Sequence, residues 1–235
     1  LVFQNMGSLY IILKLIHRYD AMENKKKLIV VEGPIGVGKT TLATKLAHTL
    51  NSKLLLENFS NNPYLKNFYK DIKRYALPTQ LFFLLQRSNE FTDKRYNEIF
   101  DNSLVSDYFL DKDKLFAEIT LTNDELILYK RIFKELNIKT PKPDLIIYLQ
   151  ADSSVLINRI KSRKISFEQD ITEKYLQSVI DAYTNYFYNY DESPLLIINT
   201  SSVDINKPHD YSMLLQEINK EVKGKKYFNP STLND

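Results

Sequence analysis

The stretch Leu28–Thr41, which reads LIVVEGPIGVGKTT, holds the residues best suited to phosphate chemistry. Gly33, Gly38, Lys39 and Thr40 match the spacing G-x-x-x-x-G-K-[ST]. Glycines adopt backbone angles that residues with a Cβ avoid, so successive N–H groups can surround phosphate oxygens. Lys39 adds a charge beside the outer phosphates, and the Thr40 hydroxyl suits Mg²⁺. We therefore expect this loop to bind a nucleoside triphosphate. The residues expected to contact it are Gly33, Pro34, Ile35, Gly36, Val37, Gly38, Lys39, Thr40 and Thr41.

Two carboxylates follow apolar runs that have the composition of buried strands. Glu57 comes directly after a run of three leucines, and Asp107 follows Leu104-Val105-Ser106. Ligands of open α/β sheets bind beyond the carboxyl ends of the strands. Glu57 is thus placed to accept a proton from an attacking hydroxyl, or it is a solvated acid at a strand end. Asp107 is expected to bind Mg²⁺, directly or through water, together with Thr40; the alternative is a helix N-cap.

Further polar residues have the spacing of a binding site. Gln80 and Arg87 lie two turns apart on one helical face, and an amide that both donates and accepts suits a nucleobase edge, although a surface Gln is commoner. The cluster Arg159–Lys164 ends a helical stretch and can neutralise phosphates during transfer, unless it is a solvated basic face. Glu168, just beyond, could reach a sugar hydroxyl.

The elements that must position these residues alternate between apolar runs and helical periods. This alternation is typical of a parallel sheet with crossover helices. The five expected strands are Leu28–Glu32, Lys53–Leu56, Leu104–Asp107, Leu145–Leu149 and Leu195–Ile198. The expected helices are Thr40–Leu50, Pro63–Tyr75, Thr79–Phe100, Asn123–Leu136, Ser153–Arg163, Thr172–Tyr190 and Asp210–Val222. We predict an α/β fold of the P-loop NTPase type: a five-stranded parallel sheet, helices on both faces and a basic lid.

Composition narrows the class of protein. The chain has 235 residues and a net charge of +3, so charge does not argue for nucleic acid as a partner. It contains no cysteine, which excludes disulfides and suits a reducing cytoplasm. Leu9–Ile16 is too short to span a bilayer, and no membrane partner is expected. We expect residues 1–21 to be an N-terminal arm or a remnant of cloning or of an upstream start, residues 22–235 to be one domain, and Lys223–Asp235 to be a polar tail.

Taken together, the ordered motifs resemble the deoxynucleoside kinase family from Lys27 to about Asn206. They are GPIGVGKTT, LLLEN, FY with Gln80 eleven residues after Tyr69, SDYFLDKDKLFAE, PDLIIYL, and RIKSR with a following Glu. The resemblance is closest to a bacterial branch of deoxyadenosine, deoxyguanosine and deoxycytidine kinases with S-D-Y after the third strand. It implies transfer of the γ-phosphoryl group of ATP, with Mg²⁺, to a deoxynucleoside 5′-hydroxyl. It also implies a homodimer through the long helices, and Phe82 and Phe83 suit the core or that dimer face better than a site.

The resemblance also assigns roles to individual residues. Glu57 would be the general base for the 5′-hydroxyl. Tyr69 and Glu168 would hold the 3′-hydroxyl, while Gln80 and Arg87 would face the base. The catalytic set that it implies is Glu57, Lys39, Arg159 and Arg163, the two arginines belonging to the lid.

Two departures from the family pattern affect the site. The usual acid-Arg pair after the third strand is here Asp107-Tyr108, so the arginine that normally lies near the 5′-hydroxyl is missing. We expect Tyr108 or a lid arginine to compensate. The third lid arginine falls at Ile165, with Lys164 as a stand-in that lacks the bidentate fork. Asp113 matches a base-reading Asp of the family if one gap is allowed.

Two alternatives to a nucleoside kinase are considered. A nucleoside monophosphate kinase of the thymidylate kinase type shares the fold and lid, but Glu57 would repel its phosphate acceptor. A P-loop regulator without a small substrate leaves Glu57, Tyr69, Gln80 and Glu168 unexplained as a set. Adenine, guanine and cytosine all fit a Gln, an Arg and an Asp, and the resemblance favours purine deoxynucleosides.

Overall fold

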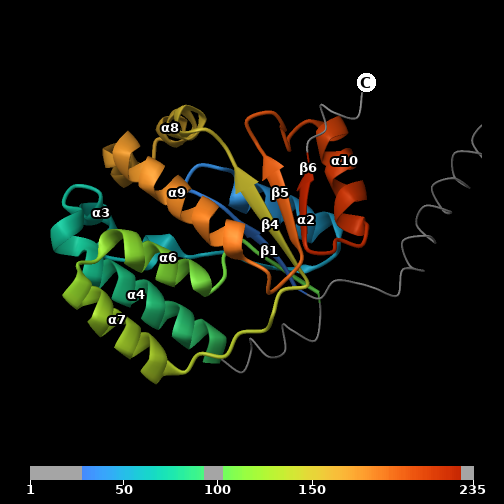
Figure 1. The fold of residues 1–235 in the computed structure, drawn as a ribbon. Coiled ribbons are helices and arrows are strands. Elements are labelled where there is room, and N and C mark those ends of the chain that lie inside the picture. Colours follow the sequence, from blue (N-terminus) through green and yellow to red (C-terminus); the bar gives the residue numbers. More distant parts are fainter. Residues whose placement is uncertain (1–27, 93–102, 229–235) are drawn as a thin grey trace, which may run out of the picture.

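The computed structural model describes residues 28–92 and 103–228, and these form an α/β fold around one parallel sheet (Figure 1). The sheet has six strands in the order β2-β3-β1-β4-β5-β6. The strands are β1 (Leu28–Glu32), β2 (Lys53–Leu55), β3 (Leu104–Ser106), β4 (Leu145–Gln150), β5 (Leu195–Asn199) and β6 (Lys225–Phe228). All five neighbouring pairs are parallel. The parallel α/β architecture is confirmed, and the five predicted strands are present.

The sixth strand corrects the prediction of five. β6 pairs with β5 from Leu195↔Lys225 to Ile198↔Phe228, inside the stretch expected to be a polar tail. Only Phe228 of this strand is buried, while Lys225, Lys226 and Tyr227 are exposed. An edge strand with one inward side chain has no alternation that a sequence pattern can detect.

Helices connect the strands and cover the sheet. Their bounds are α2 (Lys39–Thr49), α3 (Leu65–Phe68), α4 (Ile72–Thr92), α6 (Asp111–Thr120), α7 (Asn123–Leu136), α8 (Ser153–Ser162), α9 (Glu173–Asn189) and α10 (Pro208–Asn219), with 3₁₀ turns η1 (Phe59–Asn61) and η2 (Ser166–Asp170). The single helix predicted over Pro63–Tyr75 is wrong: α3 ends at Phe68, and α4 begins at Ile72 and runs through Pro78. Helix α6 is an addition to the prediction. Residues 1–27 and 229–235 and the predicted helical end 93–100 lie outside the described residues.

Helices lie on both faces of the sheet, as predicted. Helix α2 packs against β1, β2 and β3, while Tyr183 and Phe187 of α9 stack on Tyr148 of β4 with ring centroids 6.0 and 4.4 Å apart. Helices α4, α6 and α7 contact one another in a group to one side of the sheet (Figure 1). The interior strands are buried runs, Val31 and Leu149 being 0% exposed. No helix within residues 28–92 and 103–228 is long and apolar enough to cross a membrane.

Candidate active site

The loop between β1 and α2 has the backbone of a phosphate cradle. Gly33 and Gly38 have φ angles of 148° and 105°, in the region that favours glycine. A Cβ at Gly33 would lie 2.4 Å from the Leu149 carbonyl oxygen, so this position has no room for a side chain. Lys39 Nζ donates to the carbonyls of Gly33 (2.7 Å) and Pro34 (3.1 Å). Burial, together with the nearby charge of Lys112, lowers the pKa of Lys39 to about 8.

Asp107 connects the ends of three strands at this edge of the sheet. Its Oδ2 accepts a hydrogen bond from Thr40 Oγ1 at 2.5 Å, and its Oδ1 accepts one from the Glu57 backbone N–H at 2.8 Å. A hydroxyl beside a carboxylate fits Mg²⁺, which takes few protein ligands and completes its shell with phosphate oxygens and water. Accordingly, the part of the chain that the structure describes contains no group of three or more His, Cys, Asp or Glu able to hold a metal.

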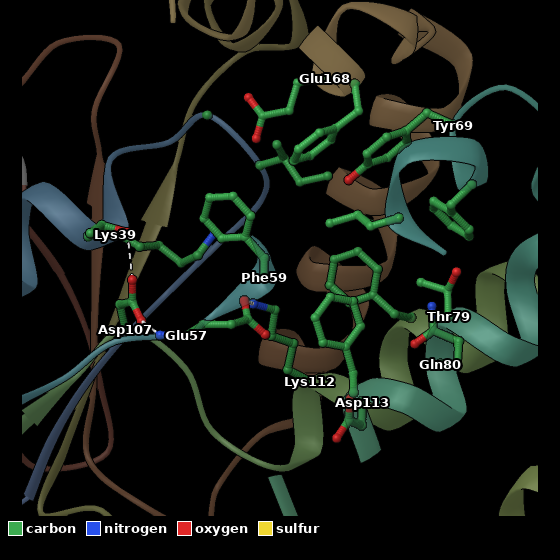
Figure 2. Close-up of a pocket in the computed structure, with 18 of the residues that line it drawn as sticks. Lys39, Glu57, Phe59, Tyr69, Thr79, Gln80, Asp107, Lys112, Asp113 and Glu168 are labelled. Atoms are coloured by element: carbon green, nitrogen blue, oxygen red, sulfur yellow. Dashed lines mark hydrogen bonds and ion pairs between the residues drawn. The ribbon is translucent and has the colours of Figure 1, made fainter. Parts of the chain in front are cut away.

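A cavity extends from this edge of the sheet to helices α4 and α6 (Figure 2). Lys39, Asp107 and Glu57 lie at one end, Gln80 and Asp113 at the other. The sequence-predicted residues that line it are Ile35, Gly36, Gly38, Lys39, Thr40, Glu57, Tyr69, Gln80, Arg87, Asp107, Asp113, Arg163 and Glu168. The structure thus brings together most residues of the predicted set. The loop residues Gly33, Pro34, Val37 and Thr41 are not part of the cavity wall.

Glu57 is held between two cations at the phosphate end of the cavity. Its Oε1 accepts from Arg87 Nη2, and its Oε2 accepts from Lys112 Nζ at 2.5 Å. Burial alone raises the pKa of Glu57, but the charges of Lys112 and Arg87 outweigh burial and bring it down to about 2. The carboxylate is therefore ionised at neutral pH, which is the form able to accept a proton.

The far end of the cavity presents groups with unused hydrogen-bonding capacity. Arg87 Nη1 pairs with Asp113 Oδ1, while Asp113 Oδ2 is buried and has no hydrogen-bond partner among the described residues. Thr79 Oγ1 is in the same situation. Gln80 Nε2 lies 3.5 Å from Thr120 Oγ1, whose own proton goes to the carbonyl four residues earlier.

A third side of the cavity carries Tyr69 and Glu168 (Figure 2). The Tyr69 ring stacks parallel to Phe167 at 6.4 Å. Burial, with smaller contributions from Tyr175 and Glu168, raises the pKa of Tyr69 well above its usual value, so its hydroxyl stays protonated. Burial also raises the pKa of Glu168, against the opposing charge of Arg163. A phenol donor beside a carboxyl suits a sugar hydroxyl.

Three further predicted residues, Arg159, Tyr108 and Lys164, do not line the cavity. Arg159 Nη1 donates to Thr200 Oγ1 (2.9 Å) and Nη2 to the Thr200 carbonyl (2.7 Å), so its guanidinium braces the loop after β5. Arg159 Nη1 also lies 3.5 Å from the carbonyl oxygen of Val37 in the phosphate loop, and its catalytic role stays a prediction. Tyr108 is buried with its hydroxyl 2.5 Å from Glu90 Oε2 and does not line the cavity. Its role as a substrate ligand stays a prediction that the cavity lining does not support. Lys164, the expected stand-in in the lid, is exposed and does not line the cavity.

Several lining residues were not predicted. The most consequential is Lys112, which the first turn of α6 directs at Glu57. Phe83, expected in the core or a dimer face, lines the cavity, as do Phe59, Phe116 and Phe167. The motif SDYFLDKDKLFAE contains Lys112 and Phe116, but no helix was predicted at 111–120, so the direction of these side chains could not be inferred. A helix predicted directly after the third strand, which ends at the site, would have placed both residues near the site.

This geometry defines a class of protein. A phosphate loop, a hydroxyl and a carboxylate able to hold Mg²⁺, and an ionised carboxylate facing an acceptor cavity are the parts of a P-loop kinase.

Comparison with known proteins identifies the family. The family model described as "Deoxynucleoside kinase" matches residues 29–223. A deoxyguanosine kinase of Bacillus subtilis is 37% identical over 161 residues, covering 68% of this chain and 78% of the relative. A deoxyadenosine/deoxycytidine kinase of the same organism is 30% identical, covering 77% and 86%. Among solved structures, a deoxyadenosine kinase from M. mycoides with bound dATP is similar in fold, with a TM-score of 0.71 at 22% identity, covering 82% of this chain and all of that one. The chain belongs to the deoxynucleoside kinase family.

Family membership confirms the prediction of an ATP-dependent deoxynucleoside kinase made from the motifs. It does not favour a nucleoside monophosphate kinase or a P-loop regulator.

Proposed function

We propose that this chain phosphorylates the 5′-hydroxyl of a deoxynucleoside whose base carries an amino group, and that purines are preferred. The observation that carries the proposal is one cavity with an ionised Glu57 at the phosphate loop and an unpaired acceptor, Asp113 Oδ2, at the far end. Arg87 contacts both Glu57 and Asp113 and so links the two ends of the cavity. This arrangement suits a nucleoside with its sugar near Glu57 and its base near Asp113.

In the proposed reaction Glu57 takes the proton of the 5′-hydroxyl as that oxygen attacks the γ-phosphorus of ATP. The new P–O bond forms while the bond from the γ-phosphorus to the β-γ bridging oxygen breaks, and ADP leaves. Lys39 and Arg163 neutralise the charge on the phosphates. Thr40 and Asp107 would hold Mg²⁺, which when bound supplies further positive charge to the triphosphate. Tyr69 and Glu168 hold the 3′-hydroxyl, which positions the sugar.

Base selection is proposed to depend on donors and acceptors at the far end. A buried carboxylate oxygen without a partner favours a ligand that donates a hydrogen bond, since leaving it unpaired costs about 1–3 kcal/mol. Adenine and cytosine carry an amino donor at the position where thymine has the O4 carbonyl, and guanine donates through the amino group on C2. Gln80 would complete the pairing. The named relatives, which are deoxyguanosine and deoxyadenosine or deoxycytidine kinases, agree with an amino-bearing base.

We also propose a cytoplasmic homodimer. Exposed apolar side chains occur on two helices that contact each other: Leu85 of α4 is 48% exposed, and Ile127 and Leu128 of α7 are 69% and 46% exposed. Covering such a patch with a second copy removes it from water. The absence of cysteine suits a reducing compartment, where ATP is available.

A substrate panel tests the proposed activity. The protein is incubated with ATP and Mg²⁺ and with deoxyadenosine, deoxyguanosine, deoxycytidine, thymidine, dAMP or dTMP, and ADP is measured. We expect the highest kcat/KM with purine deoxynucleosides, less with deoxycytidine and little with thymidine. Turnover only with the monophosphates, or equal turnover of thymidine and deoxyadenosine, would overturn the proposal. The Lys39→Met variant serves as the control for contaminating kinases, because it lacks the phosphate-binding charge.

A further inference from the structure

Lys112 is a buried cation for which the family pattern gives no role. It lies in the first turn of α6, is 7% exposed and lines the cavity. Its Nζ donates to Glu57 Oε2 at 2.5 Å (Figure 2). An ammonium group is rarely buried without a functional or structural reason, because its removal from water is costly.

The position directly after the third-strand acid cannot supply a cation in this chain. It is occupied by Tyr108, whose ring is 2% exposed and whose hydroxyl donates to Glu90 Oε2. The ring also lies 5.5 Å from the Arg87 guanidinium, on the side of α4 and away from the cavity. The arginine expected there from the family pattern therefore has no replacement at the same position in the sequence.

Arg87, the other arginine near Glu57, already has two carboxylate partners. Its Nη2 pairs with Glu57 Oε1 and its Nη1 with Asp113 Oδ1, so it joins the two ends of the cavity. Lys112 takes the other oxygen of Glu57, and its charge acts on Lys39 of the phosphate loop as well. Lys112 is thus in contact with the expected proton acceptor and close enough to the lysine of the outer phosphates for its charge to act there.

We propose that Lys112 is the positioning residue that replaces the missing family arginine from another place in the sequence. It fixes the Glu57 carboxylate by one oxygen and adds positive charge where the 5′-oxygen meets the γ-phosphoryl group. The hydroxyl proton goes to Glu57, so Lys112 takes no part in the proton transfer. When Glu57 becomes neutral, its attraction for the ammonium weakens and the charge becomes available to the transferring group. This inference rests on the proposed function, since it requires phosphoryl transfer to a hydroxyl.

The test compares the wild type with Lys112→Met, Lys112→Gln and Lys112→Arg, using kcat and the KM values for the best deoxynucleoside and for ATP. Lys114→Met is the matched control, because Lys114 is on the same helix but has a half-exposed side chain near Asp111. We expect kcat to fall about 100-fold in the two neutral variants, as for loss of one preorganised charge, and to recover largely in Lys112→Arg. The control should retain wild-type activity.

The split between kcat and KM separates this role from a merely structural one. A charge that acts on the transferring group should lower kcat and leave KM for the deoxynucleoside and for ATP within about threefold of the wild type, whereas a disturbed cavity wall should raise both KM values. Near-ultraviolet circular dichroism identifies which neutral variant retains the native fold.

The outcomes are distinguishable. A wild type that phosphorylates no deoxynucleoside overturns the proposed function, and this inference with it. An active wild type whose neutral variants keep its kcat, or lose activity through KM alone, overturns the role of Lys112 alone. Failure of Lys112→Arg to exceed Lys112→Met also refutes it, because the role requires only the positive charge at this position.

Discussion

Replacing Glu57 by glutamine tests the central assignment of the site, because Gln keeps the shape but cannot accept the hydroxyl proton. General-base catalysis contributes about 10²–10⁴-fold, so kcat should fall by that factor. Nothing in the phosphate loop contacts the Glu57 side chain through a hydrogen bond that the structure shows, so ATP affinity should change by less than about threefold. The rate is followed by ADP release, and ATP affinity by titration with a fluorescent ATP analogue.

The same substitution has a stability effect that can be estimated. The pKa of Glu57 falls from 4.5 to about 2 in the folded protein. At about 1.4 kcal/mol per pH unit, folding favours the ionised form over the neutral form by about 3 kcal/mol, and the cost of Gln should be of that order. Because the folded pKa is depressed, this stabilisation is complete above pH 4.5 and is lost as the pH falls towards 2. The difference in free energy of unfolding between wild type and Glu57→Gln should therefore be largest near pH 7 and shrink below pH 4.5.

Urea unfolding at pH 7, 5 and 3.5 measures this difference. The kcat assays are run below the melting temperatures of both the wild type and Glu57→Gln, so that a loss of stability is not mistaken for a loss of rate. Glu57→Asp is the matched control: it retains the charge while withdrawing the carboxylate, so its loss of kcat should be smaller. Near-normal kcat in Glu57→Gln would refute the assignment of the base. A stability difference that is independent of pH would refute the account of its ionisation.

Three further predictions follow from the geometry. Asp113→Asn should lower kcat/KM for deoxyadenosine about 10–100-fold and narrow the gap to thymidine, because the buried acceptor becomes an amide; an unchanged ratio of the two nucleosides contradicts base reading there. Gly33→Ala should destabilise the fold by more than about 2 kcal/mol and abolish ATP binding, because the new Cβ would meet the Leu149 carbonyl oxygen. Gly224 also has a positive φ but lies in open space, so Gly224→Ala should cost only about 1–2 kcal/mol. Urea unfolding measures both costs. Ile127→Asp should convert a dimer into a monomer in light scattering; a wild-type monomer would disprove the proposed interface.

Local signals were enough to predict the residues whose role depends on neighbours in the sequence. The loop Gly33–Thr40 follows from spacing alone, and Glu57 from its place after a strand. Lys112 depends on the direction of a helix that starts only four residues after Asp107, and its partner lies 55 positions away. Its role could not be read from the motif because a pairing between distant segments is set by how α6 packs, not by the order of residues. For Tyr108, the sequence correctly placed the residue at the end of a strand. It could not show that the side chain points towards α4, where its hydroxyl binds Glu90.

The charges of the cavity form an alternating row, Asp113–Arg87–Glu57–Lys112, with each neighbouring pair in contact. None of these four side chains is more than 16% exposed. Two negative and two positive charges sum to zero, and this pairing offsets the cost of removing the charges from water. Removing one member leaves an uncompensated charge, so every single substitution in this row affects both stability and chemistry. The row also joins the base-reading end to the proton-accepting end through Arg87. Effects of Asp113 and Glu57 variants should therefore be non-additive, and a double-mutant cycle that found simple additivity in kcat/KM would show that the two ends act independently.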